Sequence, residues 1–174
     1  MEMNTSHLKE KIQLTGGEDN DFLFTHLVLA EKEYEEIIQM MTLNELAEEL
    51  DVSFISVERK GKLEFLHVTS AEHYDSIEKK GFVIQPNSYI SDLGNGLYVI
   101  QKDDVEALMN LEDYISELYE DNEEDILLVY GTYKGAYMKC VYDRGHRGYI
   151  VLPSTESIII QDMYEKTVSE FLRY

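Results

Sequence analysis

Two short sequence patterns contain side chains that can bind a flat ligand. Each pattern lies beside a predicted turn or strand end. The first is His67-x-Thr69 after an apolar run, and the second is Gly94-x-Gly96-x-Tyr98. An aromatic ring offers a flat apolar face to a planar cation, and glycines let a backbone approach a ligand closely. Each residue also has a structural explanation, as a core histidine, a helix cap, a hairpin turn or a core tyrosine. Their occurrence together favours a binding site.

The elements that must position these patterns are a strand, a helix and a second strand. The apolar run at 63–68 predicts the first strand, and Thr69 or Ser70 is expected to cap the helix that follows. Glu72, three residues after Thr69, would complete a capping box. Gly81 is typical of a helix end. Residues 97–101 predict the second strand. The glycines before it precede a strand instead of opening a helix, so they are not a dinucleotide-binding fingerprint.

A long amphipathic helix is expected after the second strand. Asp103 is placed as its cap, with Glu106 at the third helical position. Its apolar stripe is expected to comprise Val105, Leu108, Met109, Ile115 and Leu118. We expect Glu112, Asp113 and Glu120 to be exposed. A hairpin of strands at 126–131 and 136–142, strands at 148–153 and 157–164, and a closing helix at 165–174 follow.

The order of these motifs resembles the NAD-binding half of ADP-ribosyltransferases of the diphtheria-toxin and poly-ADP-ribose-polymerase type, from residue 63 to the C-terminus. The resemblance implies that NAD is the substrate and that His67 donates a hydrogen bond to a ribose hydroxyl. The backbone of Val68 would hold the carboxamide, Thr69 would contact the ribose, and Tyr98 would stack on the nicotinamide. The loop at 92–96, with its two glycines, would cover the pocket. His67 and Tyr98 are therefore expected on adjacent strands, lining one cleft.

The glutamate that this family uses for catalysis is missing from its usual place. A carboxylate there stabilises the positive charge that develops on the ribose, and the resemblance puts it at Gly148. Glu156 or Glu165 could replace it if the loop after the strand folds back, and Asp143, which precedes the strand, is a third candidate. We therefore expect a weakly active or inactive transferase or NAD glycohydrolase, in which NAD binding survives better than turnover. No motif names an acceptor.

The element order predicts an α+β protein, because the helices do not alternate regularly with the strands. By resemblance, residues 62–174 are expected to form two packed, mostly antiparallel sheets of ADP-ribosyltransferase type. Residues 1–61 are expected to form a largely helical extension, although the apolar run at 22–30 fits either a strand or the start of a helix.

The net charge of the chain limits the classes of partner that it can bind. Thirty-five Asp and Glu against fifteen Lys and Arg give a net charge of −20. Such a chain repels nucleic acids and anionic membranes, so its acidity serves solubility or a basic protein partner. A non-enzymatic acidic interaction module is therefore the alternative to an NAD-binding protein.

The sequence offers few residues that could bind a metal ion, span a membrane or recognise DNA. The single Cys140 excludes sites built on several thiolates and is expected to be buried. We find no apolar run of about 18 residues and no secretory signal, and we expect a cytoplasmic protein. Thr42 is expected to cap a helix, with Glu45 three residues later as in a capping box. Residues 42–60 resemble a helix-turn-helix, but its second helix would offer only Arg59 and Lys60 as basic groups. A DNA-binding regulator is thus the least favoured hypothesis.

Overall fold

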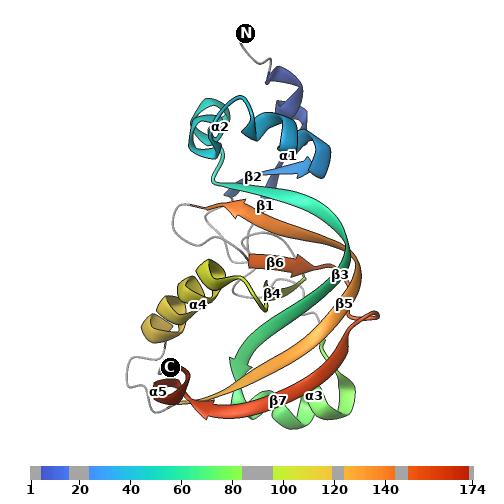
Figure 1. Cartoon of the computed structure of the whole chain (residues 1–174), viewed down its shortest axis with the longest axis vertical. Helices are drawn as coiled ribbons and strands as arrows, with labels where there is room; N and C mark the ends of the chain where they lie inside the picture. The colour runs from blue at the N-terminus through green and yellow to red at the C-terminus, as the bar shows by residue number, and fades with distance from the viewer. Residues whose placement is uncertain (1–4, 16–23, 84–95, 119–123, 144–148, 173–174) are drawn as a thin grey trace.

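A single mixed sheet of seven strands runs through the described part of the protein, in the order β1-β2-β3-β4-β6-β5-β7, with an additional pairing of β3 with β5 (Figure 1). This computed structural model describes residues 5–15, 24–83, 96–118, 124–143 and 149–172. The strands are β1 (Ile12–Thr15), β2 (Phe24–Ala30), β3 (Phe54–Ser70), β4 (Leu97–Gln101), β5 (Asp125–Tyr142), β6 (Tyr149–Leu152) and β7 (Ile159–Thr167). The α-helices are α1 (Glu31–Ile38), α2 (Leu43–Leu50), α3 (Tyr74–Lys80), α4 (Val105–Leu118) and α5 (Val168–Phe171), and the 3-10 helices are η1 (Ser6–Lys11) and η2 (Ala71–His73).

The long antiparallel pair of β3 and β5 forms a curved ribbon around which the other elements gather (Figure 1). Gly61 faces Gly135 near its middle, and their φ angles of 151° and 142° are values that glycine adopts at little cost. β4 pairs with the C-terminal half of β3, β6 pairs with the C-terminal half of β5, and β4 and β6 pair with each other. The ribbon therefore curves until its two edges are joined through β4 and β6.

The expected fold class was wrong in two respects. The strands form one mixed sheet, not two packed antiparallel sheets. The N-terminal segment is not largely helical, because β2 pairs in parallel with β3 and antiparallel with β1. The boundary expected between residues 61 and 62 lies inside β3, next to Gly61.

The hairpin expected at 126–142 is also wrong, because these residues form the single strand β5. Its backbone pairs with β3 from Ile126, opposite Ser70, to Tyr142, opposite Ile55. A partner strand of matching length keeps the chain extended through Gly135. Gly135, with a φ of 142°, stays within the strand where the local sequence indicated a reversal of direction.

The apolar side chains bury themselves in clusters on both faces of the ribbon. The N-terminal cluster includes Leu8, Leu27, Ile37, Leu46 and Ile55, which come from η1, β2, α1, α2 and β3. The central cluster, which joins β3, β4, β5 and β6, includes Phe65, Phe82, Val99, Val129 and Ile150. A third cluster, under α4 and α5, includes Leu66, Leu111, Ile115, Leu128 and Phe171. Each large side chain buried in this way stabilises the fold by about 1.5–3 kcal/mol.

Several helix ends are where the sequence places them. Thr42 Oγ1 accepts a hydrogen bond from the Glu45 backbone N–H at 3.1 Å, which confirms Thr42 as the expected N-cap of α2. Gly81 ends α3 with a φ of 71°, as expected. Asp104, one residue after the expected Asp103, caps α4 through a 3.0 Å hydrogen bond from the Ala107 N–H.

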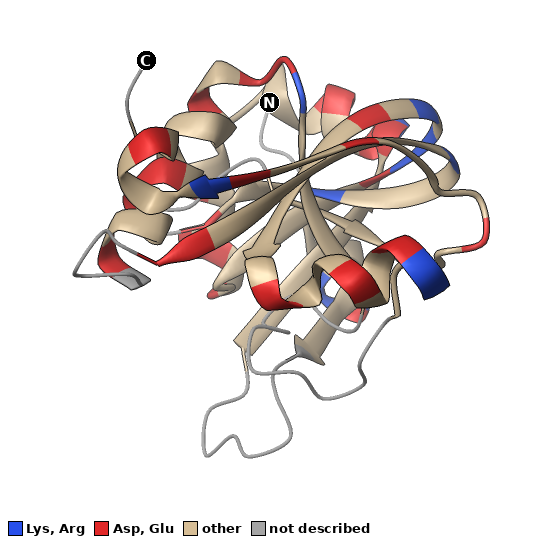
Figure 2. Cartoon of the chain, turned by 90° about the horizontal axis from the view of Figure 1, so that it is seen from below, with Lys and Arg blue, Asp and Glu red and all other residues tan. Residues whose placement is uncertain are grey.

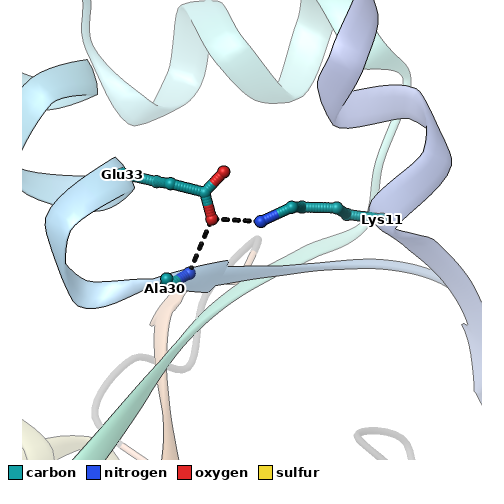
Figure 3. A network of polar contacts seen from close by, with 3 residues as sticks. All are labelled: Lys11, Ala30 and Glu33. Carbon is teal, nitrogen blue, oxygen red and sulfur yellow. Dashed lines mark hydrogen bonds and ion pairs between the residues drawn. The ribbon is translucent and has the colours of Figure 1, made fainter.

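The first turn of α1 is held by a small polar network (Figure 3). One oxygen of Glu33 accepts hydrogen bonds from the Ala30 backbone N–H, at 3.0 Å, and from the Lys11 ammonium group. Burial works to raise the pKa of Glu33, but the hydrogen bonds from Lys11 and Ala30 outweigh it and hold that pKa below its usual value. The ionised carboxylate thus ties η1 to α1.

The face that α4 buries differs from the expected stripe. Ala107, Leu111 and Ile115 face the sheet, with exposures of 2, 7 and 3%. Val105 and Met109, expected to be buried, are 69 and 60% exposed. The apolar residues of α4 cover more than one side of the helix, so contact with the sheet decides which of them are buried.

The other expectations for α4 have mixed outcomes. Ile115 is buried and Asp113 is exposed, as expected, whereas Leu108 and Glu112 are half-buried. The side chain of Leu118, and all of Glu120, lie outside the described residues.

Candidate functional site

His67 and Tyr98 lie on neighbouring strands, as the sequence patterns predict. His67 is near the end of β3 and Tyr98 is on β4, which pairs antiparallel with it. The Nδ1–H of His67 donates a hydrogen bond to the Tyr98 carbonyl oxygen at 2.7 Å. The imidazole also meets the ring of Phe82 edge-on, with centroids 5.2 Å apart at 83°. The backbone of Tyr98, not its ring, therefore fixes the orientation of His67.

The side chains of His67 and Tyr98 nevertheless point to opposite faces of the sheet. Phe65 and Val99 belong to the central cluster, and side chains alternate between faces along a strand. His67, two residues after Phe65, therefore shares its face, whereas Tyr98, next to Val99, does not. The Tyr98 ring packs instead beside Val151 in the small cluster with Phe54 and Cys140. A ligand gripped between the two side chains does not fit this geometry.

The environment of His67 favours a neutral imidazole at pH 7. Burial lowers the pKa of His67, the carbonyl of Tyr98 works in the opposite direction, and the nearby charge of His73 adds to the lowering. With its Nδ1 proton held by the carbonyl, the neutral ring carries its lone pair on Nε2. His67 can therefore accept a hydrogen bond or a proton at Nε2, on the face of the sheet that Phe82 occupies.

Val68 and Thr69 continue β3 and have structural partners. Val68 pairs with Leu128 of β5 and packs toward α4, and Thr69 pairs with Leu127. Of the two expected caps the structure shows Ser70, whose hydroxyl accepts the Glu72 backbone N–H at 3.5 Å, and the capping box at Thr69 is not formed. Thr69 is part of the β3–β5 ladder instead.

Gly96 is required by the packing of β4 against β6. A Cβ atom on Gly96 would lie 2.4 Å from Val151 Cγ1 and 2.8 Å from the Leu152 carbonyl oxygen. Such distances are far inside van der Waals contact, so no larger residue fits without movement of the backbone. The strand contact alone explains this glycine. Gly94, the other glycine of the pattern, lies outside the described residues.

The three candidate catalytic carboxylates lie at separate places. Glu165 is on β7, opposite Leu127 of β5, so it is two strands away from β3, or about 10 Å. Glu156 is exposed in the turn after β6, where its N–H donates to Ser154 Oγ at 3.2 Å. Asp143 follows β5, where it acts with burial and Tyr114 to raise the pKa of Tyr149 to about 12. Gly148 lies outside the described residues.

The hollows on the described surface lie away from the expected site. One, of about 310 Å³, is lined by Lys62, Leu63, Glu64, Gln101, Asp103 and Tyr137. A second, of about 220 Å³, lies between α1, α4 and β5 and includes the Lys139–Asp104 ion pair. His67 and Tyr98 line neither of them. Within the described residues, no group of three or more His, Cys, Asp or Glu side chains could hold a metal ion.

A buried His26–Ser56 pair was missed by the sequence patterns. The two side chains are 1 and 0% exposed, and His26 Nε2 lies 2.6 Å from Ser56 Oγ. Nδ1 of His26 has no hydrogen-bond partner in the described part of the protein, and burial lowers its pKa to about 4. Cys140 lies opposite Ser56 on β5 and is 1% exposed, which confirms its expected burial. The only sequence signal was a histidine inside an apolar run.

Figure 2 shows that Asp and Glu residues, in red, are spread over the helices and outnumber the Lys and Arg residues, in blue. Among the described residues, ion pairs join Lys11 to Glu33, Lys139 to Asp104 at 3.5 Å, and His73 to Glu72 at 3.7 Å. Many carboxylates of α1, α2 and α4 are exposed. The described helices therefore present a largely acidic surface to the solvent.

No helix in the described residues has the length and apolar character needed to cross a membrane. Comparison of the chain with known protein families, with curated proteins and with solved structures finds no match. The resemblance to ADP-ribosyltransferases therefore rests on the short motifs alone.

Proposed function

We propose that this protein is a non-enzymatic interaction module that binds a basic protein partner through its acidic surface. The observation that carries the proposal is the uncompensated charge of α4. Glu106, Asp113 and Glu117 are exposed, and none of them forms an ion pair with a residue that the structure describes. Basic side chains of a partner would neutralise these carboxylates and, through the long-range field, speed the encounter.

The arrangement of these charges has a cost that a partner would remove. Asp113 and Glu117 are four residues apart on α4, so they are neighbours on the helix surface. Like charges at this spacing destabilise a helix by about 0.2–0.5 kcal/mol per pair. Solubility requires net charge but not this spacing. Pairing with a basic segment would turn the repulsion into attraction.

An NAD-binding protein of the ADP-ribosyltransferase type is the second candidate. It is favoured by the hydrogen bond from His67 to the Tyr98 carbonyl, which links the two residues of the motif. The opposite orientation of their side chains and the distance to Glu165 count against it. DNA recognition by residues 42–60 has less support than either of these functions. The second helix of a helix-turn-helix, which contacts the DNA, would begin where Phe54–Ser70 forms a strand.

The test compares three ligands at a salt concentration of about 0.15 M, where weak surface attractions are screened. A labelled lysine-rich peptide, a glutamate-rich peptide of the same length, and NAD are titrated into the full chain. We expect saturable binding of the basic peptide alone, weakening as salt is added, with no nicotinamide release from NAD. Failure of the basic peptide to bind refutes the proposal. NAD binding that is lost in both His67→Ala and Tyr98→Ala would put the second candidate in its place.

A further inference from the structure

The outer face of α4 carries two large apolar side chains that the fold leaves uncovered. Val105 and Met109 are 69 and 60% exposed, although Ala107, Leu111 and Ile115 of the same helix are almost fully buried. Residues four apart lie one above the other on a helix, so Val105 and Met109 form one continuous apolar surface. α4 thus has a second apolar side that points away from the sheet.

Carboxylates border this surface. At 100° per residue, Glu106, Asp113 and Glu117 lie on the same exposed side of α4 as Met109. The sequence of α4 contains no Lys, Arg or His. Each of these three carboxylates also lacks an ion pair within the described residues. An apolar centre with a charged rim is the usual composition of a protein-binding surface.

We propose that this outer α4 face is the docking site for a basic amphipathic helical segment of the protein partner. The inference rests on the proposed function and locates it. An amphipathic helix would cover Val105 and Met109 with its apolar row, while Lys or Arg side chains beside that row would reach the carboxylates. The flexible side chain of Met109 can adapt to the partner's apolar row.

The charges on this face argue against other occupants. A second copy that used the same face would bring the same three carboxylates against each other, since a two-fold interface is self-complementary. A bilayer with anionic lipids would repel them. A basic segment is the occupant whose charge complements Glu106, Asp113 and Glu117.

The first experiment measures the contribution of the apolar centre. The probe is a labelled peptide of about 18 leucine and lysine residues ordered to give one apolar helix face, and the control peptide has the same composition in shuffled order. We expect the ordered peptide to bind more tightly than the shuffled one. Met109→Gln should weaken the ordered peptide about tenfold. Met40→Gln, which changes a methionine that is 49% exposed on a different part of the surface, should have no effect.

The second experiment tests whether binding depends on the carboxylates of the outer α4 face or only on the net charge of the protein. The double variant Asp113→Asn with Glu117→Gln removes two charges from α4, and Glu35→Gln with Glu36→Gln removes two from the exposed side of α1. We expect the α4 variant to lower the association rate and the salt dependence of binding, and the α1 variant to leave both close to those of the unmodified chain. Unchanged thermal melting of all variants shows that the fold is intact.

Each result decides between explanations. Equal binding of ordered and shuffled peptides, or no effect of Met109→Gln, overturns the α4 site while the acidic interaction function stands. Absence of binding by both peptides overturns that function as well. Self-association in sedimentation experiments that is lost in Met109→Gln would identify a second copy as the occupant and overturn the proposal.

Discussion

The buried His26–Ser56 pair should make the folded state sensitive to mild acid. His26 is on β2 and Ser56 on β3, and their side chains lie within hydrogen-bonding distance, 2.6 Å apart. Phe54 meets the imidazole edge-on, and Cys140 lies across from Ser56 on β5. None of these neighbours supplies a carboxylate that would stabilise an imidazolium ion. A proton on His26 would therefore be a buried charge without a counter-ion.

The sign and size of the effect follow from the pKa. Burial lowers the pKa of His26 from 6.5 to about 4 in the folded state. Between these two pH values the unfolded chain binds more protons than the folded one, so stability rises with pH and falls on acidification. Integration from pH 7.5 to pH 5 gives a loss of about 2 kcal/mol, and the full shift corresponds to about 3 kcal/mol below pH 4.

A double variant isolates this contribution from that of the 35 Asp and Glu residues, which also titrate in acid. His26→Leu with Ser56→Ala removes both partners and should change the stability at neutral pH little, because neither group is left buried and unpaired. Urea unfolding followed by circular dichroism gives the free energy of unfolding at each pH. Between pH 7.5 and 5 we expect the unmodified chain to lose about 2 kcal/mol more than the variant.

The carboxylates are common to both proteins, so their contribution cancels in this difference. A difference in stability that stays constant from pH 7.5 to 5 would refute the reasoning, since it would show that His26 titrates alike in the folded and unfolded states. The single variant Ser56→Ala is a control. It leaves the imidazole buried without its partner, and it should be less stable than the double variant.

Two further substitutions test the packing and the helix caps. Gly131→Ala would place a Cβ atom 2.8 Å from the Ile159 carbonyl oxygen and 2.8 Å from Phe65 Cζ, so we expect a loss of about 1–3 kcal/mol in urea unfolding. An unchanged midpoint would contradict the close contact of β5 with β7. Thr42→Ala removes the hydrogen bond to the Glu45 N–H and should cost about 1 kcal/mol, whereas Thr42→Ser should retain most of the stability. Equal losses in both variants would argue against the cap.

Local signals in the sequence located several elements correctly. Thr42 and Glu45 predicted the start of α2, and Gly81 predicted the end of α3. Residues 97–101 were predicted as a strand and form β4. Such features depend on hydrogen bonds and backbone angles within a few residues, so neighbouring side chains are enough to specify them.

Long-range pairing decided what the local signals left open. Residues 126–142 form one strand because β3 pairs with them along their length, and α4 buries Leu111 while it exposes Met109 because of where the sheet lies. The N-terminal segment joins the sheet through the pairing of β2 with β3. None of these contacts is encoded within a short window of sequence.

In the candidate site, too, local sequence signals and long-range pairing determined different features. Local patterns were enough to predict that a histidine and a tyrosine lie on strands. The structure makes those strands neighbours, with His67 hydrogen-bonded to the Tyr98 carbonyl. Only the strand register decided that their side chains point to opposite faces. The side-chain period of a strand is two, so a shift of one residue moves a side chain to the other side of the sheet. That register is set by the pairing of β3, β4 and β6, and it becomes fixed only when the tertiary structure forms.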